Sequence, residues 1–475
     1  MTVSPGDTFV RMDLRNIHSV YFLGIGGIGM SALARYFNAL GKKVSGYDKT
    51  RTKLTDELIA EGIEIHFEDH IRNIPAHIKE LPYDTENILI VYTPAVPKDH
   101  SEYVFFNLNG FNIKKRAEVL GMITDSARTI AVAGTHGKTT TSSLTAHILK
   151  TAGLDPSAFL GGITQNYNTN LLLSKELKQS AANSEQLIVV EADEYDRSFL
   201  TLHPDIAVIT SADPDHLDIY GDSEHVTESF NLFAELVKSK LIVKRSISGK
   251  IKKKAVTYAV NDDAADYFAQ NIVIRNGSYH YEIVTPTNIF EKLTLGLPGM
   301  HNVENSVAAV AIANELNIAE EHIRKALETF KGVKRRFDYH IKTDKLVYID
   351  DYAHHPEELK AAISSAKEMY PGKKITGVFQ PHLYSRTRDF ADDFAKSLDL
   401  LDECILLEIY PARELPIDGV SSQMLMDKMK SEKKSIVQKT DLVDNLAKRE
   451  LEVLMTMGAG DIDTFIEPIT KQLSK

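Results

Sequence analysis

Short apolar runs that end in glycine or in charged residues recur along the chain and predict buried strands. The first run covers residues 19–23 and passes through a glycine-rich turn into residues 30–40, which we interpret as a helix. A second apolar run follows at residues 43–47. Uninterrupted apolar runs of this length are typical of strands buried on both faces of a parallel sheet. The pattern therefore predicts a strand, a glycine turn, a helix and a second strand.

The same order of elements occurs twice more. A second unit begins with the apolar run 129–133, and it continues through a glycine loop into a predicted helix over 142–149. Its further strands are predicted at residues 187–190 and 206–209, and those of a third unit at 346–349, 376–379 and 405–409. Strands that alternate with helices indicate an α/β fold with parallel sheets.

We therefore predict three domains, and the length of 475 residues agrees with this because one hydrophobic core stops growing well below that size. The expected domains are an N-terminal Rossmann-like domain (1–115), a central domain like a P-loop ATPase (116–332) and a C-terminal Rossmann-like domain (333–475).

Composition narrows the class of protein. Hydrophobic residues make up 43% and charged residues 25% of the chain, as in soluble globular proteins. The formal charge of -11 argues against sequence-independent binding to nucleic acid, which needs a basic surface. The single cysteine, Cys404, cannot form an internal disulfide, so the cytoplasm is the default compartment. Its apolar neighbours predict an inert thiol in the core.

One stretch imitates a targeting signal. Residues 16–34 carry no formal charge and follow Arg11 and Arg15, loosely as in a signal peptide. The four glycines in this stretch favour the strand-to-helix junction instead. No other stretch is long and apolar enough to span a bilayer, so we expect no membrane insertion. The sequence leaves open whether the protein is a monomer or a homodimer.

The first glycine turn has the pattern G-x-G-x-x-G. Gly24 permits a tight turn, Gly26 lets the backbone approach a pyrophosphate, and Gly29 allows a helix to pack closely on a strand. Asp48 ends the second strand, where its carboxylate can reach a ribose hydroxyl. The pattern alone is weak and does not identify the nucleotide. A turn that only packs remains an alternative.

The second glycine loop, at residues 133–140, predicts a phosphate site. Its backbone N–H groups form an anion cradle, Lys138 can reach β- and γ-phosphates, and Thr139 can hold Mg²⁺. Val132 stands where the full P-loop pattern has a glycine, so the loop is a shortened variant. Glu191 and His216 follow strands of the same unit and are candidate Mg²⁺ ligands. A surface carboxylate and a satisfied loop histidine are the alternatives.

Together and in this order, the motifs resemble those of the Mur ligase family, and the resemblance covers nearly the whole chain. It is greatest to the members that add the first amino acid of the cell-wall peptide. The residues that carry it are Gly24-Ile-Gly-Gly-Ile-Gly-Met-Ser31, Gly134-Thr-His-Gly-Lys-Thr-Thr140, Glu191-Ala-Asp-Glu194, Asp215-His-Leu-Asp218, Pro298-Gly-Met-His301-Asn302 with Asn305, Arg335-Arg-Phe337, Asp351-Tyr-Ala-His-His-Pro356 and Phe379-Gln-Pro-His382 with Ser385-Arg-Thr387.

The resemblance implies an amide-forming ligase that uses ATP and Mg²⁺ to join L-alanine to UDP-N-acetylmuramate through an acyl phosphate, in peptidoglycan precursor synthesis. The implied UDP-sugar residues are Gly24, Gly26, Gly27, Gly29, Asp48 and Thr93. The implied ATP residues are Gly134, Thr135, His136, Gly137, Lys138, Thr139, Thr140, Asn302, Asn305, Arg336 and Asp351. The implied metal ligands are Thr139, Glu191 and His216, and the implied amino-acid residues are Tyr352, His354, Arg386 and Arg413. Lys138, His354 and Arg386 are the expected catalytic residues, although the sequence does not choose between His354 and His355.

Three departures from the family pattern concern binding residues. Thr93-Pro94 replaces a usual pair of serines, and Ser211 replaces a usual asparagine. Leu383 stands where the family has an arginine, while Arg413 stands where it has a glycine. Our hypothesis is that Arg413 binds the amino-acid carboxylate together with Arg386, and a solvated surface arginine is the alternative.

Other classes of function remain to be weighed. A dehydrogenase that uses NAD fits the first glycine turn but leaves the Lys138 loop unexplained. A P-loop ATPase that acts as a motor or switch explains Lys138 but not the first domain. A non-catalytic binding protein is the third alternative, and a ligase that attaches a whole tripeptide to the same sugar is the rival within the family.

Overall fold

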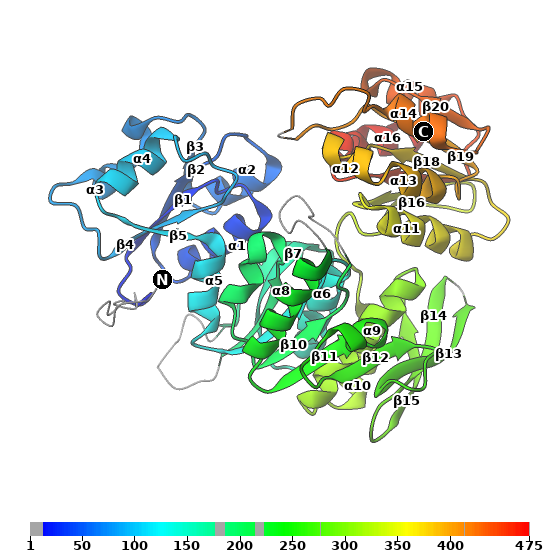
Figure 1. Ribbon diagram of the computed structural model, residues 1–475, viewed down its shortest axis with the longest axis horizontal. Helices are drawn as coiled ribbons and strands as arrows, with labels where there is room; N and C mark the ends of the chain where they lie inside the picture. Colours follow the sequence, from blue (N-terminus) through cyan, green and yellow to red (C-terminus); the bar gives the residue numbers. More distant parts are fainter. Residues whose placement is uncertain (1–12, 176–185, 214–222, 276, 413, 475) are drawn as a thin grey trace.

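Three separate sheets organise the chain (Figure 1). The computed structural model describes residues 13–175, 186–213, 223–275, 277–412 and 414–474. The central sheet, drawn mostly in green, lies between the N-terminal sheet in blue and the C-terminal sheet in yellow to red. The predicted α/β fold with three sheet domains is confirmed. The predicted domain limits at 115/116 and 332/333 stay predictions.

The N-terminal sheet is fully parallel, with strand order β3-β2-β1-β4-β5. All five residues of β1 are buried, as expected for a strand covered on both faces. Because residues 19–23 form this strand and the helix α1 follows it, the resemblance of 16–34 to a signal peptide is accidental. The elements are β1 (Ser19–Leu23), α1 (Ile28–Ala39), β2 (Lys43–Tyr47), α2 (Lys53–Ala60), β3 (Glu64–His66), α3 (Ala76–Lys79), β4 (Ile88–Tyr92), α4 (Ser101–Leu108) and β5 (Asn112–Lys115).

The central sheet has ten strands in the order β15-β14-β13-β12-β11-β10-β6-β9-β7-β8. The predicted strands 129–133, 187–190 and 206–209 are β6, β9 and β10 at its middle. The antiparallel extension β13 to β15 was not predicted. The elements are α5 (Arg116–Thr124), β6 (Arg128–Ala133), α6 (Lys138–Thr151), β7 (Ser157–Thr164), β8 (Thr169–Leu172), β9 (Leu187–Ala192), β10 (Ile206–Ile209), α8 (Ser223–Leu236), β11 (Lys240–Lys244), β12 (Val256–Val260), β13 (Tyr267–Arg275), β14 (Ser278–Val284), β15 (Ile289–Leu295), α9 (Met300–Glu315) and α10 (Glu320–Thr329).

The C-terminal sheet has the order β16-β17-β21-β18-β19-β20, and only β16 is antiparallel to its neighbour. The predicted strand 405–409 is wrong in its bounds, because β19 ends at Leu406 and the chain then follows the loop after β18, where Tyr410 donates its N–H to Pro381 O. The elements are β16 (Asp338–Lys342), β17 (Val347–Asp351), α11 (Pro356–Met369), β18 (Ile375–Phe379), α12 (Tyr384–Asp389), α13 (Ala391–Leu398), β19 (Glu403–Leu406), α14 (Ser422–Lys428), β20 (Lys434–Ile436), α15 (Leu442–Ala447), β21 (Val453–Met457) and α16 (Ile466–Leu473).

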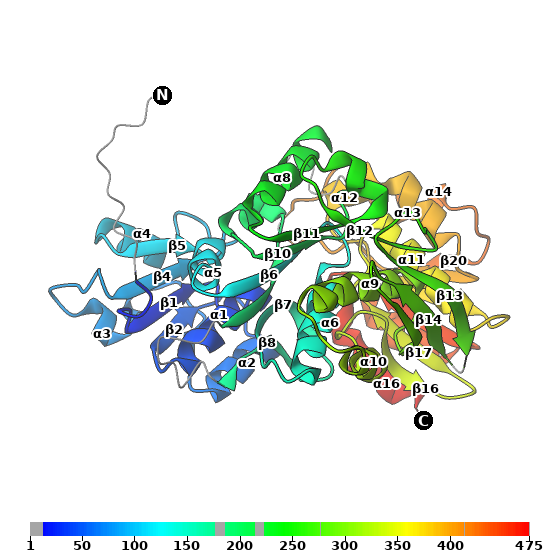
Figure 2. The ribbon, with the colours of Figure 1, turned by 90° about the horizontal axis from the view of Figure 1, so that it is seen from below.

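A buried contact joins the N-terminal and central sheets, where α1 packs against β7 and β8 (Figure 2). The Asn170 side chain, in β8, donates to Ile28 O at 2.6 Å and accepts from Arg35 at 2.8 Å. Arg35 also pairs with Glu61 in its own domain. Asn170 has no exposed surface, so the contact fixes the start of α1 against the central domain.

Cys404 is buried in β19, and burial raises the pKa of its thiol to about 12, as expected for an inert core thiol. Within the described ranges, the structure has no helix with the length and apolar character needed to cross a bilayer.

Candidate active site

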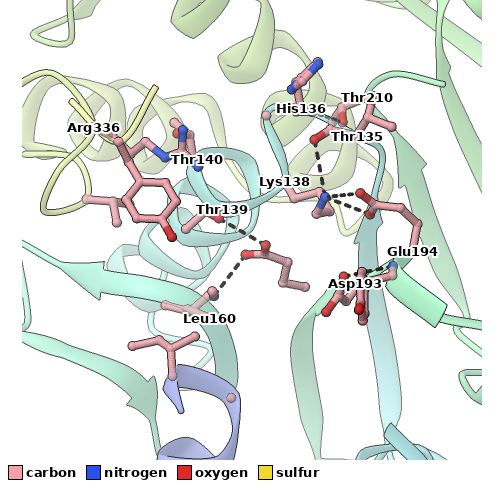
Figure 3. Close-up of a pocket in the computed structure, with 18 of the residues that line it drawn as sticks. Thr135, His136, Lys138, Thr139, Thr140, Leu160, Asp193, Glu194, Thr210 and Arg336 are labelled. Atoms are coloured by element: carbon pink, nitrogen blue, oxygen red, sulfur yellow. Dashed lines mark hydrogen bonds and ion pairs between the residues drawn. The ribbon is translucent and has the colours of Figure 1, made fainter. Parts of the chain in front are cut away.

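One pocket of about 930 Å³ lies where the three domains meet. Its wall includes the glycine turn of the N-terminal domain, the phosphate loop of the central domain and the loop after β17 of the C-terminal domain. Figure 3 shows the side chains around the phosphate loop. The predicted site residues on its wall are Gly27, Gly29, Thr93, Thr135, His136, Gly137, Lys138, Thr139, Thr140, Glu191, Asn302, Asn305, Arg336, Asp351, Tyr352 and His354.

The phosphate loop joins β6 to α6, and its shape depends on glycine. Gly137 is the residue before α6 and has φ of 81°, which favours glycine. Ser211 stabilises the loop, because its Oγ accepts the N–H of His136 at 2.7 Å and contacts Thr135 Oγ1 at 2.8 Å. The serine that departs from the family pattern therefore holds the loop in shape, a role that the sequence did not indicate.

Lys138 points into the pocket and is paired with Glu194 (Figure 3). Its ammonium lies 2.7 Å from Glu194 Oε2 and 2.5 Å from Gly134 O. Burial opposes the charge on the amine, but the carboxylates of Glu194 and Glu191 outweigh it and raise the pKa of Lys138 above its usual value. Lys138 is therefore a fixed positive charge at neutral pH.

Glu191 and Thr139 form an oxygen pair beside the lysine. Thr139 Oγ1 donates to Glu191 Oε1 at 3.1 Å, and Gly161 N–H donates to Oε2 at 2.9 Å. Burial raises the pKa of the Glu191 carboxyl, while Lys138 opposes that shift. A carboxylate and a hydroxyl are hard oxygen donors of the kind Mg²⁺ takes. Among the residues placed by the structure, no three His, Cys, Asp or Glu side chains are grouped as a metal site, and His216 lies outside the described residues.

The N-terminal glycine turn presents only part of its predicted residues to the pocket. Gly24 has φ of 88°, as a tight turn requires, and lies outside the wall with Gly26 and Asp48. The Asp48 carboxylate instead accepts the N–H of Gly26 at 2.7 Å, so it braces the turn.

The expected packing of Gly29 on a strand is wrong, because a Cβ there would meet the side chain of Arg116 at 2.9 Å. The missing side chain makes room for this guanidinium, which pairs with Asp193 at 3.1 Å. Arg116 therefore brings a positive charge to the first turn of α1, on the wall of the pocket.

The start of α9 lies against the phosphate loop. Asn302 donates its side-chain N–H to Pro298 O at 2.6 Å, and Asn305 donates to Asn302 Oδ1 at 3.3 Å. A Cβ on Gly137 would lie 2.7 Å from Asn305 Oδ1, which shows how closely helix and loop approach. Two amides therefore stand beside the phosphate site, where they can recognise a polar ring such as a nucleotide base.

Asp351, at the end of β17, braces the connection from the central domain. Its carboxylate accepts N–H groups from Phe337 and Ala353, each at 2.8 Å. Burial raises the pKa of its carboxyl to about 6, although Arg336 opposes the shift.

The structure distinguishes the two adjacent histidines by position. His354 lines the pocket and lies 3.1 Å from Glu358, whereas His355 precedes α11 and packs its ring on Phe390 at 4.8 Å. His354 is therefore the one that faces the pocket.

The other predicted amino-acid residues extend from His354 into the C-terminal domain. The rings of His354 and His382 lie 6.2 Å apart, and Arg386 contacts His382 Nδ1 at 3.4 Å. Arg386 is not on the pocket wall, and Arg413 lies outside the described residues.

Three residues of the site, Arg116, Glu358 and Gly161, were not identified from the sequence. Asp193 and Glu194 were part of a motif, and the structure adds their pairing with Arg116 and Lys138. Glu358 stands in the first turn of α11 and resembles an ordinary helix-start acid. Gly161 lies inside β7 next to Gly162, and glycine inside a strand is a signal of close approach by another group.

Comparisons with known proteins agree with this architecture. Family models match in order: "Mur ligase family, catalytic domain" over residues 19–128, "Mur ligase middle domain" over 132–313 and "Mur ligase, glutamate ligase domain" over 335–461.

Two relatives match over almost their whole lengths. UDP-N-acetylmuramate--L-alanine ligase of Flavobacterium johnsoniae is 52% identical over 464 residues, covering 98% of this chain and 100% of that protein. The protein of the same name from Parabacteroides distasonis is 51% identical over 470 residues, covering 98% and 99%.

Solved structures share the fold. The UDP-N-acetylmuramate-alanine ligase from Thermotoga maritima has a TM-score of 0.80 at 28% identity and covers 96% of this chain and 100% of its own. A murein peptide ligase from Psychrobacter arcticus has a TM-score of 0.71 at 22% identity, covering 96% and 99%, and shows the fold alone. On the family models and on relatives about half identical over the full length, this chain belongs to the Mur ligase family.

Proposed function

We propose that the protein joins L-alanine to the carboxylate of UDP-N-acetylmuramate, consuming ATP and releasing ADP and phosphate, in the cytoplasmic synthesis of a peptidoglycan precursor. The observation that carries the proposal is the single pocket shared by three domains. It brings a diphosphate-type glycine turn, an ATP-type phosphate loop and a histidine-bearing loop to one space. The two relatives described above are named for this ligation, and about half of their residues are identical to those of this chain.

In the first step, a carboxylate oxygen of the sugar attacks the γ-phosphorus of ATP, and the bond to the bridging oxygen of ADP breaks. Negative charge gathers between the two reactants, and Lys138 is the cation placed to offset it. The lysine exchanges its contact with Glu194 for one with phosphate oxygens. The Thr139 and Glu191 oxygens fit Mg²⁺, with His216 as a further ligand, and the bound ion would supply charge neutralisation at the phosphates.

In the second step, the amine of L-alanine attacks the acyl carbon, and a tetrahedral intermediate then expels phosphate. The incoming ammonium must first lose a proton, and His354 is the base that faces the pocket. Positioning accounts for most of the rate, because the amine and the acyl phosphate are held by different domains. Arg386, with Arg413, is assigned to the amino-acid carboxylate.

The test is a product assay with the purified protein. ADP should form only when UDP-N-acetylmuramate, L-alanine and ATP are all present, and the product should gain the mass of one alanine residue. If the sugar carboxylate carries ¹⁸O, one label should pass to the released phosphate, as an acyl phosphate requires. ADP formation without the sugar or the amino acid would contradict the proposal, and preference for a tripeptide over L-alanine would favour the rival ligase.

The role of Arg413 needs its own test. Arg413→Ala should raise the KM for L-alanine by about 10- to 150-fold, because a charged hydrogen bond to a carboxylate contributes roughly 1.5–3 kcal/mol. Initial rates at varied L-alanine measure this, with the KM for ATP as the internal control. An unchanged KM for L-alanine would remove Arg413 from the site.

A further inference from the structure

The Glu358 carboxylate stands at the point where the phosphate loop meets the C-terminal domain. It lies in the first turn of α11, only 14% of its side chain is exposed, and it lines the pocket. Groups from three segments surround it: His136 of the phosphate loop, Arg336 of the connection between domains and His354 of the loop after β17.

The two oxygens of Glu358 face different domains. Oε2 accepts the backbone N–H of His354 at 3.0 Å and lies 3.1 Å from the Nδ1 of the same residue. Oε1 lies 3.5 Å from His136 Nδ1 and 3.5 Å from an Arg336 guanidinium nitrogen. One rigid planar group therefore contacts the ATP loop on one side and the candidate base on the other.

A buried negative charge on Glu358 is stable only if positive or hydrogen-bonding groups lie beside it. Burial by itself would disfavour the ionised carboxyl, but His354, His136 and Arg336 outweigh it and hold the pKa of Glu358 well below its usual value. An acid that served only to start α11 would need only the helix dipole and the His354 N–H. The contact of Oε1 with His136, in the phosphate loop of the central domain, exceeds that requirement.

We propose that Glu358 is a positioning residue that couples nucleotide binding at the phosphate loop to the placement of His354. The proposal rests on the proposed function for the role of His354 but not for the contact itself. Movement of His136 when phosphates enter the loop is passed through Glu358 to His354. The ATP site and the amine site are then set in one arrangement.

The test is a double-mutant cycle with Glu358→Gln and His136→Ala. Glutamine keeps the size of the side chain and can still accept from the His354 N–H, but it loses the charge that faces His136 and Arg336. Glu467→Gln is the matched control, since Glu467 is also in the first turn of a helix of the C-terminal domain but is exposed. Thermal unfolding of each variant controls for folding.

The coupling is measured by binding and by rates. Glu358→Gln should raise the Kd for ADP about fivefold in the wild-type background and less than about twofold with His136→Ala. Each single change should lower kcat/KM for L-alanine about tenfold, and the double variant should lose little more than either. The KM for UDP-N-acetylmuramate, bound by another domain, should stay the same. Glu467→Gln should match wild type throughout.

Several outcomes would overturn the coupling. The first is that the effects of Glu358→Gln and His136→Ala on the Kd for ADP and on kcat/KM for L-alanine multiply in the double variant. The second is that Glu358→Gln behaves like Glu467→Gln. The third is that Glu358→Gln raises the KM for UDP-N-acetylmuramate as much as it lowers kcat/KM for L-alanine. If Glu358→Gln does not fold, Glu358→Asp takes its place in the cycle, because the shorter side chain keeps the charge but draws it back from His136 and His354. A wild-type protein that makes no product would refute the proposed function, while the ADP cycle would still decide the role of Glu358.

Discussion

Alanine at Gly161 is expected to disable catalysis and leave the fold intact. Gly161 lies in β7, which pairs with β9, and its N–H donates to the Glu191 carboxylate at 2.9 Å. A Cβ built on Gly161 would lie 2.5 Å from Glu191 Cδ, whereas ordinary contacts begin at 3.4 Å. The carboxylate, whose Oε2 would lie closer still, must therefore move by about 1 Å or more, away from the position in which it meets Thr139.

The size of the effect follows from which atoms have to move. The clash is with the end of a flexible side chain rather than with backbone, so a new rotamer relieves it for about 1 kcal/mol of stability. A displacement of about 1 Å in a catalytic site costs on the order of 100-fold in rate. Gly161→Ala should thus lower kcat about 100-fold and raise the Mg²⁺ concentration needed for half-maximal rate, with little change in Tm.

The assay is phosphate release at saturating substrates over a range of Mg²⁺ concentrations, with thermal unfolding in parallel. Gly249→Ala is the control, since a Cβ on Gly249 has no atom within 4 Å. A Gly161→Ala protein with kcat and Mg²⁺ dependence within twofold of wild type would refute the reasoning. A loss of rate matched by a large fall in Tm would also refute it, because the fold would then be at fault.

Three further changes test other parts of the structure. Lys138→Ala should lower kcat by about 10² to 10³-fold in the phosphate-release assay, with Lys150→Ala on the same helix as control. Burial raises the pKa of the Glu102 carboxyl to about 7 in the folded protein, whereas the unfolded chain loses this proton above about pH 4.5. The free energy of unfolding therefore falls as the pH rises from about 4.5 to about 7. Glu102→Gln should therefore match wild type near pH 4 and raise the free energy of unfolding by up to about 3 kcal/mol at pH 8 in urea titrations; equal stability at pH 8 would contradict the assigned pKa. Asn170→Ala should raise the KM for UDP-N-acetylmuramate several-fold and leave that for ATP unchanged, and equal changes in both would argue against a role limited to the first domain.

The sequence was most informative where structure is local. A strand, a glycine turn and a helix lie within about 25 residues, so the apolar run 19–23 and the loop around Lys138 could be placed correctly. The phosphate loop could be inferred without its neighbours because backbone N–H groups at a helix start bind anions in any fold.

Contacts between domains could not be predicted in this way. Glu358 and His136 are more than 200 positions apart, and their meeting depends on how two separately folded sheets are placed. Asn170 lies in a short hairpin with no periodic signal, yet it joins two domains. Gly161 shows the same limit, because only the position of Glu191 on the neighbouring strand reveals why a side chain is excluded there.

The buried contact of Asn170 with α1 also bears on how many ATP molecules the protein would consume for each amide bond formed. On the proposed function, this contact fixes the sugar and phosphate sites on one body, so the exposure of the acyl phosphate depends on the C-terminal domain alone. An acyl phosphate that meets water before an amine is hydrolysed, and one ATP is lost without product. On this proposal, the ratio of ADP released to amide formed is governed by how well the C-terminal side of the pocket excludes water.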